Sequence, residues 1–103
     1  MKIEKEAVCG NIESGDIQVT LSPNEEEGIV IELTSVVKPI FGDAIEETVR
    51  EVLADFEIDT AKVTLQDKGA LDCVIRARMQ AALLRSLGQK YDWSKEDALW
   101  QAV

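Results

Sequence analysis

A serine set between acidic residues and a glycine is the most distinctive candidate for chemistry in the sequence: Glu13-Ser14-Gly15-Asp16. Glycine permits a tight bend, so the segment is predicted to form a turn with Ser14 exposed at its corner. Most tetrapeptides of this kind are turns and nothing more. An exposed hydroxyl beside glycine is also accessible to a modifying enzyme, and Glu13 and Asp16 either guide such an enzyme or only define the turn.

Other residue types that support catalysis offer no second site. The chain has no histidine, which excludes imidazole acid/base catalysis and a histidine-containing zinc site. It has no GxSxG nucleophile elbow and no glycine-rich phosphate loop, and most carboxylates fall on predicted solvent faces. Cys9 and Cys73 are interpreted as small buried apolar residues, the alternative being a reactive thiol. We therefore expect neither catalysis nor a metal site from this chain.

The length, apolar content and charge of the chain limit the classes of protein to which it can belong. At 103 residues and 46% apolar content, the chain suits one domain with its own core. No apolar run approaches the roughly 20 residues that span a bilayer and no secretory signal is present, so we expect a cytoplasmic location. The net charge is −9, and residues 1–60 carry 15 acids against 4 bases. This charge disfavours nucleic acid and anionic membranes, and suits either a solvated surface or a partner with a basic face.

Three segments alternate between apolar and polar residues, which is typical of strands with one buried face. They cover residues 17–22, 29–34 and 61–66, and residues 7–12 are apolar enough for a further short strand. Because residues 23–28 are rich in turn formers and glutamate, the first two alternating segments are expected to pair as a hairpin. The 61–66 strand lies between two helical segments, which suits a place inside the sheet.

Two longer segments have helical periodicity. Residues 38–56 form the first, and Ser35 is a candidate cap for it. The second is predicted to open at Asp67 or Gly69 and to end at Gly88. The predicted apolar faces consist of Phe41, Ile45, Val49, Val52, Leu53 and Phe56 in the first helix, and of Leu71, Val74, Ile75, Ala82 and Leu83 in the second.

The order β-β-β-α-β-α predicts an α+β fold, a small mostly antiparallel sheet with two long helices packed on one face. The domain is expected to comprise residues 1–88, followed by a C-terminal tail at residues 89–103. In that tail Ser94 and Asp97 resemble a capping box, so a short helix is one expectation and a flexible segment is the other.

Six short motifs occur together in the order and at the separations of one known family. They are Ala7-Val8, Gly10, Glu13-Ser14-Gly15-Asp16, Phe41-Gly42-Asp43-Ala44-Ile45, Val52-Leu53-Ala54 and Asp67-Lys68-Gly69-Ala70-Leu71-Asp72-Cys73 with Arg76-Ala77-Arg78. Together they span about residues 7–87 and resemble the acyl carrier (gamma) subunit of citrate lyase. The last motif is the most distinctive.

The resemblance implies a non-catalytic carrier within a multi-subunit lyase that converts citrate to acetate and oxaloacetate. Ser14 matches the family's modified serine, which holds phosphoribosyl-dephospho-coenzyme A through a phosphodiester. The implied partners are the transferase (alpha) subunit, the lyase (beta) subunit and a prosthetic-group transferase, for which Glu13, Gly15 and Asp16 are candidate recognition residues. Helix capping accounts for Asp67 in the distinctive motif.

Three alternatives stay open. The carrier of malonate decarboxylase uses the same kind of arm, although residues 67–73 favour citrate lyase. From other classes, the chain could be a non-covalent metabolite-binding regulatory module. It could also be a structural adaptor that docks a partner through its acidic face and its tail.

Overall fold

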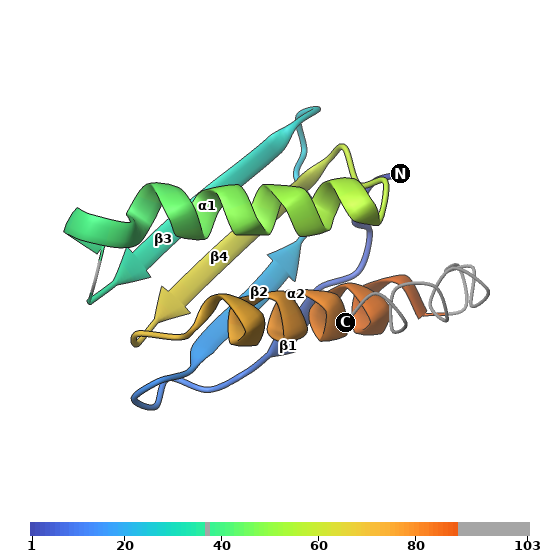
Figure 1. Cartoon of the computed structure of the whole chain (residues 1–103). Coiled ribbons are helices and arrows are strands. Elements are labelled where there is room, and N and C mark those ends of the chain that lie inside the picture. The colour runs from blue at the N-terminus through green and yellow to red at the C-terminus, as the bar shows by residue number, and fades with distance from the viewer. Residues whose placement is uncertain (37, 89–103) are drawn as a thin grey trace.

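The computed structural model describes residues 1–36 and 38–88 (Figure 1). Its elements are β1 (Ala7–Cys9), β2 (Ile17–Ser22), β3 (Ile29–Ser35), α1 (Lys38–Asp55), β4 (Ala61–Asp67) and α2 (Asp72–Leu87). The predicted element order and the α+β class are confirmed. The predicted tail at residues 89–103 lies outside the described residues.

The four strands form one mixed sheet in the order β1-β2-β4-β3. β2 is antiparallel to β1 and to β4, whereas β3 runs parallel to β4. The predicted hairpin between residues 17–22 and 29–34 is therefore wrong, because β4 lies between these two strands. The connection at residues 23–28 can step across β4 because an extended chain covers about 3.3 Å per residue, while neighbouring strands are about 4.8 Å apart.

Both helices cover the same face of the sheet, and the core lies between the two layers (Figure 1). Alternate residues of β2 and β4 point into this layer, as their alternating sequences predict. The buried side chains of these strands and helices include Ile17, Val19, Leu21, Ala61, Val63, Leu65, Ile45, Val49, Val52, Leu53, Phe56, Ile75, Met79, Ala82 and Leu83.

Three residues predicted to be buried are exposed instead. Phe41 is 54% exposed and Leu71 is 70% exposed. Phe41 lies in the first turn of α1, and Leu71 lies in the loop before α2. Cys73 is exposed near the start of α2, whereas Cys9 is buried as expected.

The helix boundaries agree with the sequence at three of four ends. α1 matches its predicted span to within one residue, and α2 ends before Gly88, whose φ of 53° suits glycine. The predicted start of α2 at Asp67 or Gly69 is wrong, because Asp67 continues β4 and residues 68–71 form a loop. Among residues 1–36 and 38–88, neither helix has the length and apolar content that crossing a membrane requires.

Candidate functional site

Ser14 lies at the corner of a tight turn between β1 and β2. The backbone amide of Asp16 donates a hydrogen bond of 3.0 Å to the carbonyl of Glu13, which closes the turn. Gly15 has a φ of 81°, a left-handed conformation that glycine adopts without strain. Glu13, Ser14 and Gly15 are exposed, so the predicted exposed turn is confirmed.

Backbone hydrogen bonds join this turn to the loop that follows β4. The amide of Gly15 donates to the carbonyl of Lys68 at 2.8 Å, and the amide of Lys68 donates to the carbonyl of Asp16 at 2.9 Å. These bonds continue the antiparallel ladder beyond its last pair, Ile17 with Asp67. The serine turn is thereby supported by β4, one of the two inner strands of the sheet.

An ion pair joins the same turn to α2. Arg78 donates from Nε to Oδ1 of Asp16 and from Nη2 to Oδ2, both at 3.0 Å. The amide of Ile17 also donates to Oδ1 of Asp16 at 2.7 Å. The Arg78 hydrogen bonds, followed by that of Ile17, lower the pKa of Asp16, and the pKa of Arg78 is raised. The Asp16 side chain therefore faces Arg78 of α2 and is mostly buried, whereas Glu13 is exposed.

Gly10 allows β1 to approach the start of β2 closely. Its φ is 94°, and a Cβ atom built there would lie 1.9 Å from the carbonyl oxygen of Ile17. Only glycine fits this position without a shift of the backbone. Gly10 and Ile17, which lie on either side of the Ser14 turn in the sequence, are thus close together in the fold.

A buried carboxylate shapes the loop that supports the turn. Asp67 is 1% exposed, and its Oδ2 accepts hydrogen bonds from the Ser35 hydroxyl at 2.7 Å and the Gly69 amide at 3.2 Å. Its Oδ1 accepts from the amide of Ala70 at 3.0 Å. Helix capping was the expected role of Asp67, and it is wrong, because Asp67 ends β4 and binds the loop before α2. Ser35, the candidate cap of α1, ends β3.

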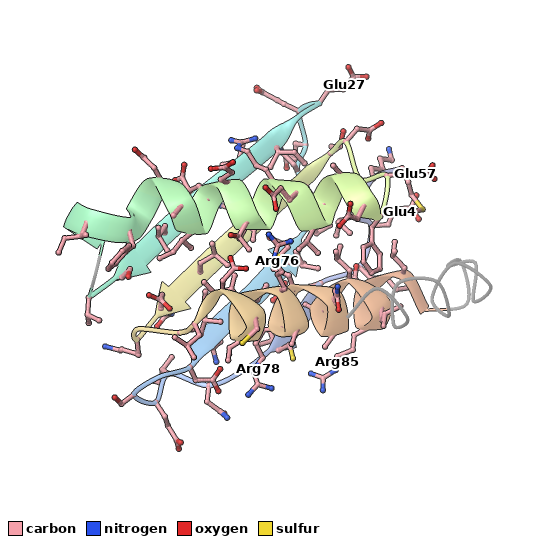
Figure 2. The ribbon with its side chains drawn as sticks, in the orientation of Figure 1. Glu4, Glu27, Glu57, Arg76, Arg78 and Arg85 are labelled. Carbon is pink, nitrogen blue, oxygen red and sulfur yellow. The ribbon has the colours of Figure 1, made fainter. Side chains whose placement is uncertain are left out.

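A second cluster of charged residues holds the two helices together. Thr48 of α1 donates to Oδ1 of Asp72 at 2.6 Å, and Arg76 donates to Oδ2 at 2.8 Å. Arg76 also binds Glu51 of α1. The Thr48 hydrogen bond, followed by that of Arg76, lowers the pKa of Asp72. Figure 2 shows Arg76 on the side of α2 that faces α1, with Arg78 on the opposite side.

The arrangement offers an accessible hydroxyl on a well-supported turn. With no histidine in the sequence, no imidazole is available to activate Ser14 as a nucleophile. Within residues 1–36 and 38–88, no group of three or more metal-ligating side chains lies together. The geometry suits a hydroxyl that accepts a covalently attached group.

Sequence reasoning missed two contributors to this site, Arg78 and the backbone of Lys68. Arg78 was named as part of a motif, and nothing local ties it to Asp16, 62 residues earlier. Both residues do fall within the distinctive motif at residues 67–78, which lies directly against the serine turn. That proximity is the signal that connects the motif with Ser14.

Comparison with protein families and curated proteins shows what the chain is similar to. The sequence profile of a family described as malonate decarboxylase delta subunit (MdcD) matches residues 4–86. Citrate lyase acyl carrier protein 2 of Salmonella typhimurium is 50% identical over 95 residues, covering 91% of this chain and 98% of that protein. The citrate lyase acyl carrier protein of Streptococcus equi subsp. zooepidemicus is 43% identical over 103 residues, covering 99% of this chain and all (100%) of its own.

Solved structures share the fold. A chain of a Pseudomonas malonate decarboxylase hetero-tetramer in complex with malonate superposes with a TM-score of 0.63 at 23% identity, covering 81% of this chain and 84% of that one. Homoserine kinase from Cytophaga hutchinsonii gives a TM-score of 0.54 at 14% identity, covering 85% of this chain but 35% of the kinase. At these identities the likeness concerns the fold alone.

Proposed function

The chain belongs to the family of citrate lyase acyl carrier proteins, and we propose that it is the acyl carrier subunit of a citrate lyase, with Ser14 as the attachment point of its prosthetic group. The observation that carries this proposal is the exposed Ser14 hydroxyl on a turn bonded to Lys68 and Arg78. Both supporting residues belong to the motif through which the chain most resembles that family.

The surroundings of Ser14 fit a bulky substituent. Next to it, a Cβ atom built on Gly15 would meet no atom within 4 Å, so the turn faces open space. The group that the family implies is phosphoribosyl-dephospho-coenzyme A, which would supply a terminal thiol for acetyl and citryl thioesters. Ser14 would hold this group through a phosphodiester, and the fixed turn would direct it away from the body of the carrier.

The residues around the serine divide the tasks of recognition and support. Glu13 and Gly15 are exposed and available to the enzyme that attaches the group. The Asp16 carboxylate is bound by Arg78, so in this proposal Asp16 acts by holding the turn. Of the four residues Glu13-Ser14-Gly15-Asp16, direct contact with the attachment enzyme is assigned to the first three.

Tethering explains why a carrier without catalytic residues is useful. A group held on Ser14 stays at high effective concentration near the active sites of its partners, which makes each transfer nearly intramolecular. We propose the transferase (alpha) and lyase (beta) subunits as these partners, acting together in the cytoplasm. Conversion of citrate to acetate and oxaloacetate would then occur on those subunits.

Intact mass spectrometry of the protein purified with its attachment enzymes tests this proposal. We expect a covalent adduct on the wild-type chain that is lost in Ser14→Ala. Ser22→Ala, which changes a serine at the other end of β2, is the matched control and should keep the adduct. An unmodified carrier inside an active lyase complex would contradict the proposal. Thermal stabilisation by a metabolite without any adduct would favour a non-covalent binding module.

The acyl carrier of malonate decarboxylase is a second candidate function. It is favoured by the family profile that matches residues 4–86 and by the structural likeness to the Pseudomonas hetero-tetramer. The identities of 43–50% to citrate lyase acyl carrier proteins favour citrate lyase. The acyl group found on the loaded arm distinguishes the two, since citryl indicates citrate lyase and malonyl indicates the decarboxylase.

A further inference from the structure

The most exposed apolar side chains of the described residues gather at the end of the sheet that carries Ser14. More than half of the surface of each is exposed, and they are Ile12, Val36, Ile40, Phe41 and Leu71. The topology places them together, because β2 begins at this end and β3 and β4 both finish there (Figure 1). Such a concentration of exposed apolar surface is typical of an interaction site.

A cleft of about 300 Å³ lies within this apolar surface, between the first half of α1 and the start of α2. Its walls include Phe41, Ala44, Ala70, Leu71 and Ile75. Thr48 also lines the cleft, but its hydroxyl is already bonded to Asp72. The walls of the cleft are therefore mainly apolar, which suits a large apolar side chain as the occupant.

One loop connects the cleft with the serine turn. The backbone of Lys68 is bonded to Gly15 and Asp16, and the next three residues, 69–71, line the cleft. Asp67 binds the amides of Gly69 and Ala70, so the loop is held from beneath. A molecule seated in the cleft would therefore lie beside the group attached to Ser14.

Charge beside the cleft indicates the chemistry of the occupant. The outer surface of α1 carries a shallow groove lined by Asp43, Glu46, Glu47 and Glu51, with Arg50 as the basic residue among them. Asp43 and Glu47 are the chain neighbours of Ala44 and Thr48, which line the cleft, and Glu51 is paired with Arg76. This acidic groove would repel a small anion such as a carboxylate or a phosphate. It would attract a protein surface on which lysine or arginine lies beside the apolar side chain.

We propose that this cleft is the docking site for an enzyme subunit of the lyase complex. That subunit inserts one large apolar side chain between Phe41 and Leu71, and its basic residues face Asp43 and Glu47 of α1. The inference rests on the proposed carrier function and adds the surface by which the carrier presents Ser14 to its partner.

Filling the cleft tests the proposal. Ala44→Phe places a ring in the cleft from an exposed position on α1, and Ala77→Phe makes the same change at an exposed position on α2 that does not line it. Binding of each modified carrier to the purified transferase and lyase subunits is measured by titration. We expect Ala44→Phe to raise Kd at least tenfold for one of these subunits, and Ala77→Phe to leave it within twofold.

Intact mass of the same samples separates this inference from the proposed function. An adduct on Ser14 with unchanged binding of Ala44→Phe to both subunits overturns the docking site alone. Absence of the adduct from the wild-type chain overturns the carrier function itself. Concentration-dependent self-association that Ala44→Phe abolishes would assign the cleft to a second copy of the chain, and would also overturn the proposal.

A charge reversal tests the acidic side of the docking site. The double variant Asp43→Lys with Glu47→Lys should weaken binding to the same subunit and reduce its dependence on salt. Glu25→Lys with Glu26→Lys makes an equal change in net charge in the loop at the opposite end of the sheet. Equal effects of the two double variants would show that only net charge matters and would contradict the proposed orientation.

Discussion

The two ends of the sheet use their acidic residues in opposite ways. At the Ser14 end, two carboxylates bind backbone or arginine, Asp67 with Gly69 and Ala70 and Asp16 with Arg78, although Glu13 there is exposed. At the other end, the β2–β3 loop carries three exposed glutamates, and Figure 2 shows Glu27 extending from the loop into solvent. The loop is closed by a 3.2 Å hydrogen bond from Asn24 Nδ2 to the Gly28 carbonyl.

The difference indicates where the chain needs fixed geometry. A carboxylate that accepts several hydrogen bonds from separate segments holds those segments in one arrangement. A solvated carboxylate contributes charge and solubility but little to backbone position. Hydrogen bonds thus hold the Ser14 turn in one arrangement, whereas the glutamates of the β2–β3 loop are exposed to water.

Removal of Asp67 should have the largest effect on stability. Asp67→Ala leaves the amides of Gly69 and Ala70 without their partner inside the fold, so the free energy of unfolding should fall by about 3 kcal/mol. Asp59→Ala, at the far end, removes a carboxylate that is 76% exposed and should change it by less than about 0.5 kcal/mol. Urea unfolding of both variants checks the contrast, and equal losses would contradict it.

Alanine substitutions at two glycines should differ in their effect on stability, by less than the two aspartate variants do. Gly10 and Gly28 have φ values of 94° and 114°, so alanine is strained at both. At Gly10 the new Cβ would also meet the Ile17 carbonyl, whereas at Gly28 it would meet nothing within 4 Å. Gly10→Ala should therefore be more destabilising than Gly28→Ala by about 2 kcal/mol.

Thermal or urea unfolding measures this pair, and amide exchange adds a local readout. Faster exchange at Gly15 and Lys68 in Gly10→Ala than in Gly28→Ala would place the disturbance at the serine turn. Equal stabilities of the two variants would show that the close approach of β1 to β2 relaxes without cost.

Removal of the Asp16–Arg78 ion pair should have the smallest effect on stability, and this effect should depend on pH. Arg78 is 39% exposed, so Asp16→Asn should cost only about 1 kcal/mol at neutral pH. Because the pKa of Asp16 is lowered from 3.8 in the folded state, its contribution is present above that value. It is lost as the pH falls through the lower folded pKa.

The difference in stability between wild type and Asp16→Asn should therefore shrink below about pH 4. Urea unfolding at pH 7 and near pH 2.5 measures it. A difference that persists at the lower pH would show that shape at position 16, and not its charge, supports the turn.

Local patterns predicted the elements of this fold but not all their neighbours. The alternating residues of β2, β3 and β4 identify strands because each buries one side. The hairpin expected at residues 23–28 failed because β2 and β3 could each accept either of the other strands as a neighbour. What decides the order is the β3–α1–β4 connection, which returns β4 parallel to β3 and brings it between the two.

The sequence predicted the exposed serine turn itself better than the residues that hold the turn in place. The turn at Glu13–Asp16 follows from its own residues, since glycine and polar side chains favour it. Arg78 acts through a contact with Asp16, 62 residues earlier, and Asp67 binds Ser35, 32 residues earlier, as well as its own loop. No local rule predicts the two distant contacts. A strand that ends in aspartate also runs against strand propensity, which is why a helix start was expected there. The assignment of Ser14 as the modified residue stays a prediction.

The separation of Asp16 and Arg78 by 62 residues has a consequence for biosynthesis. The serine leaves the ribosome early, while the strand and helix that support its turn are translated much later. Until β4 and α2 have emerged, the nascent chain contains Ser14 but not the folded turn, because a domain folds as a unit. An attachment enzyme that recognises the folded turn would therefore act on completed carriers and pass over unfinished chains.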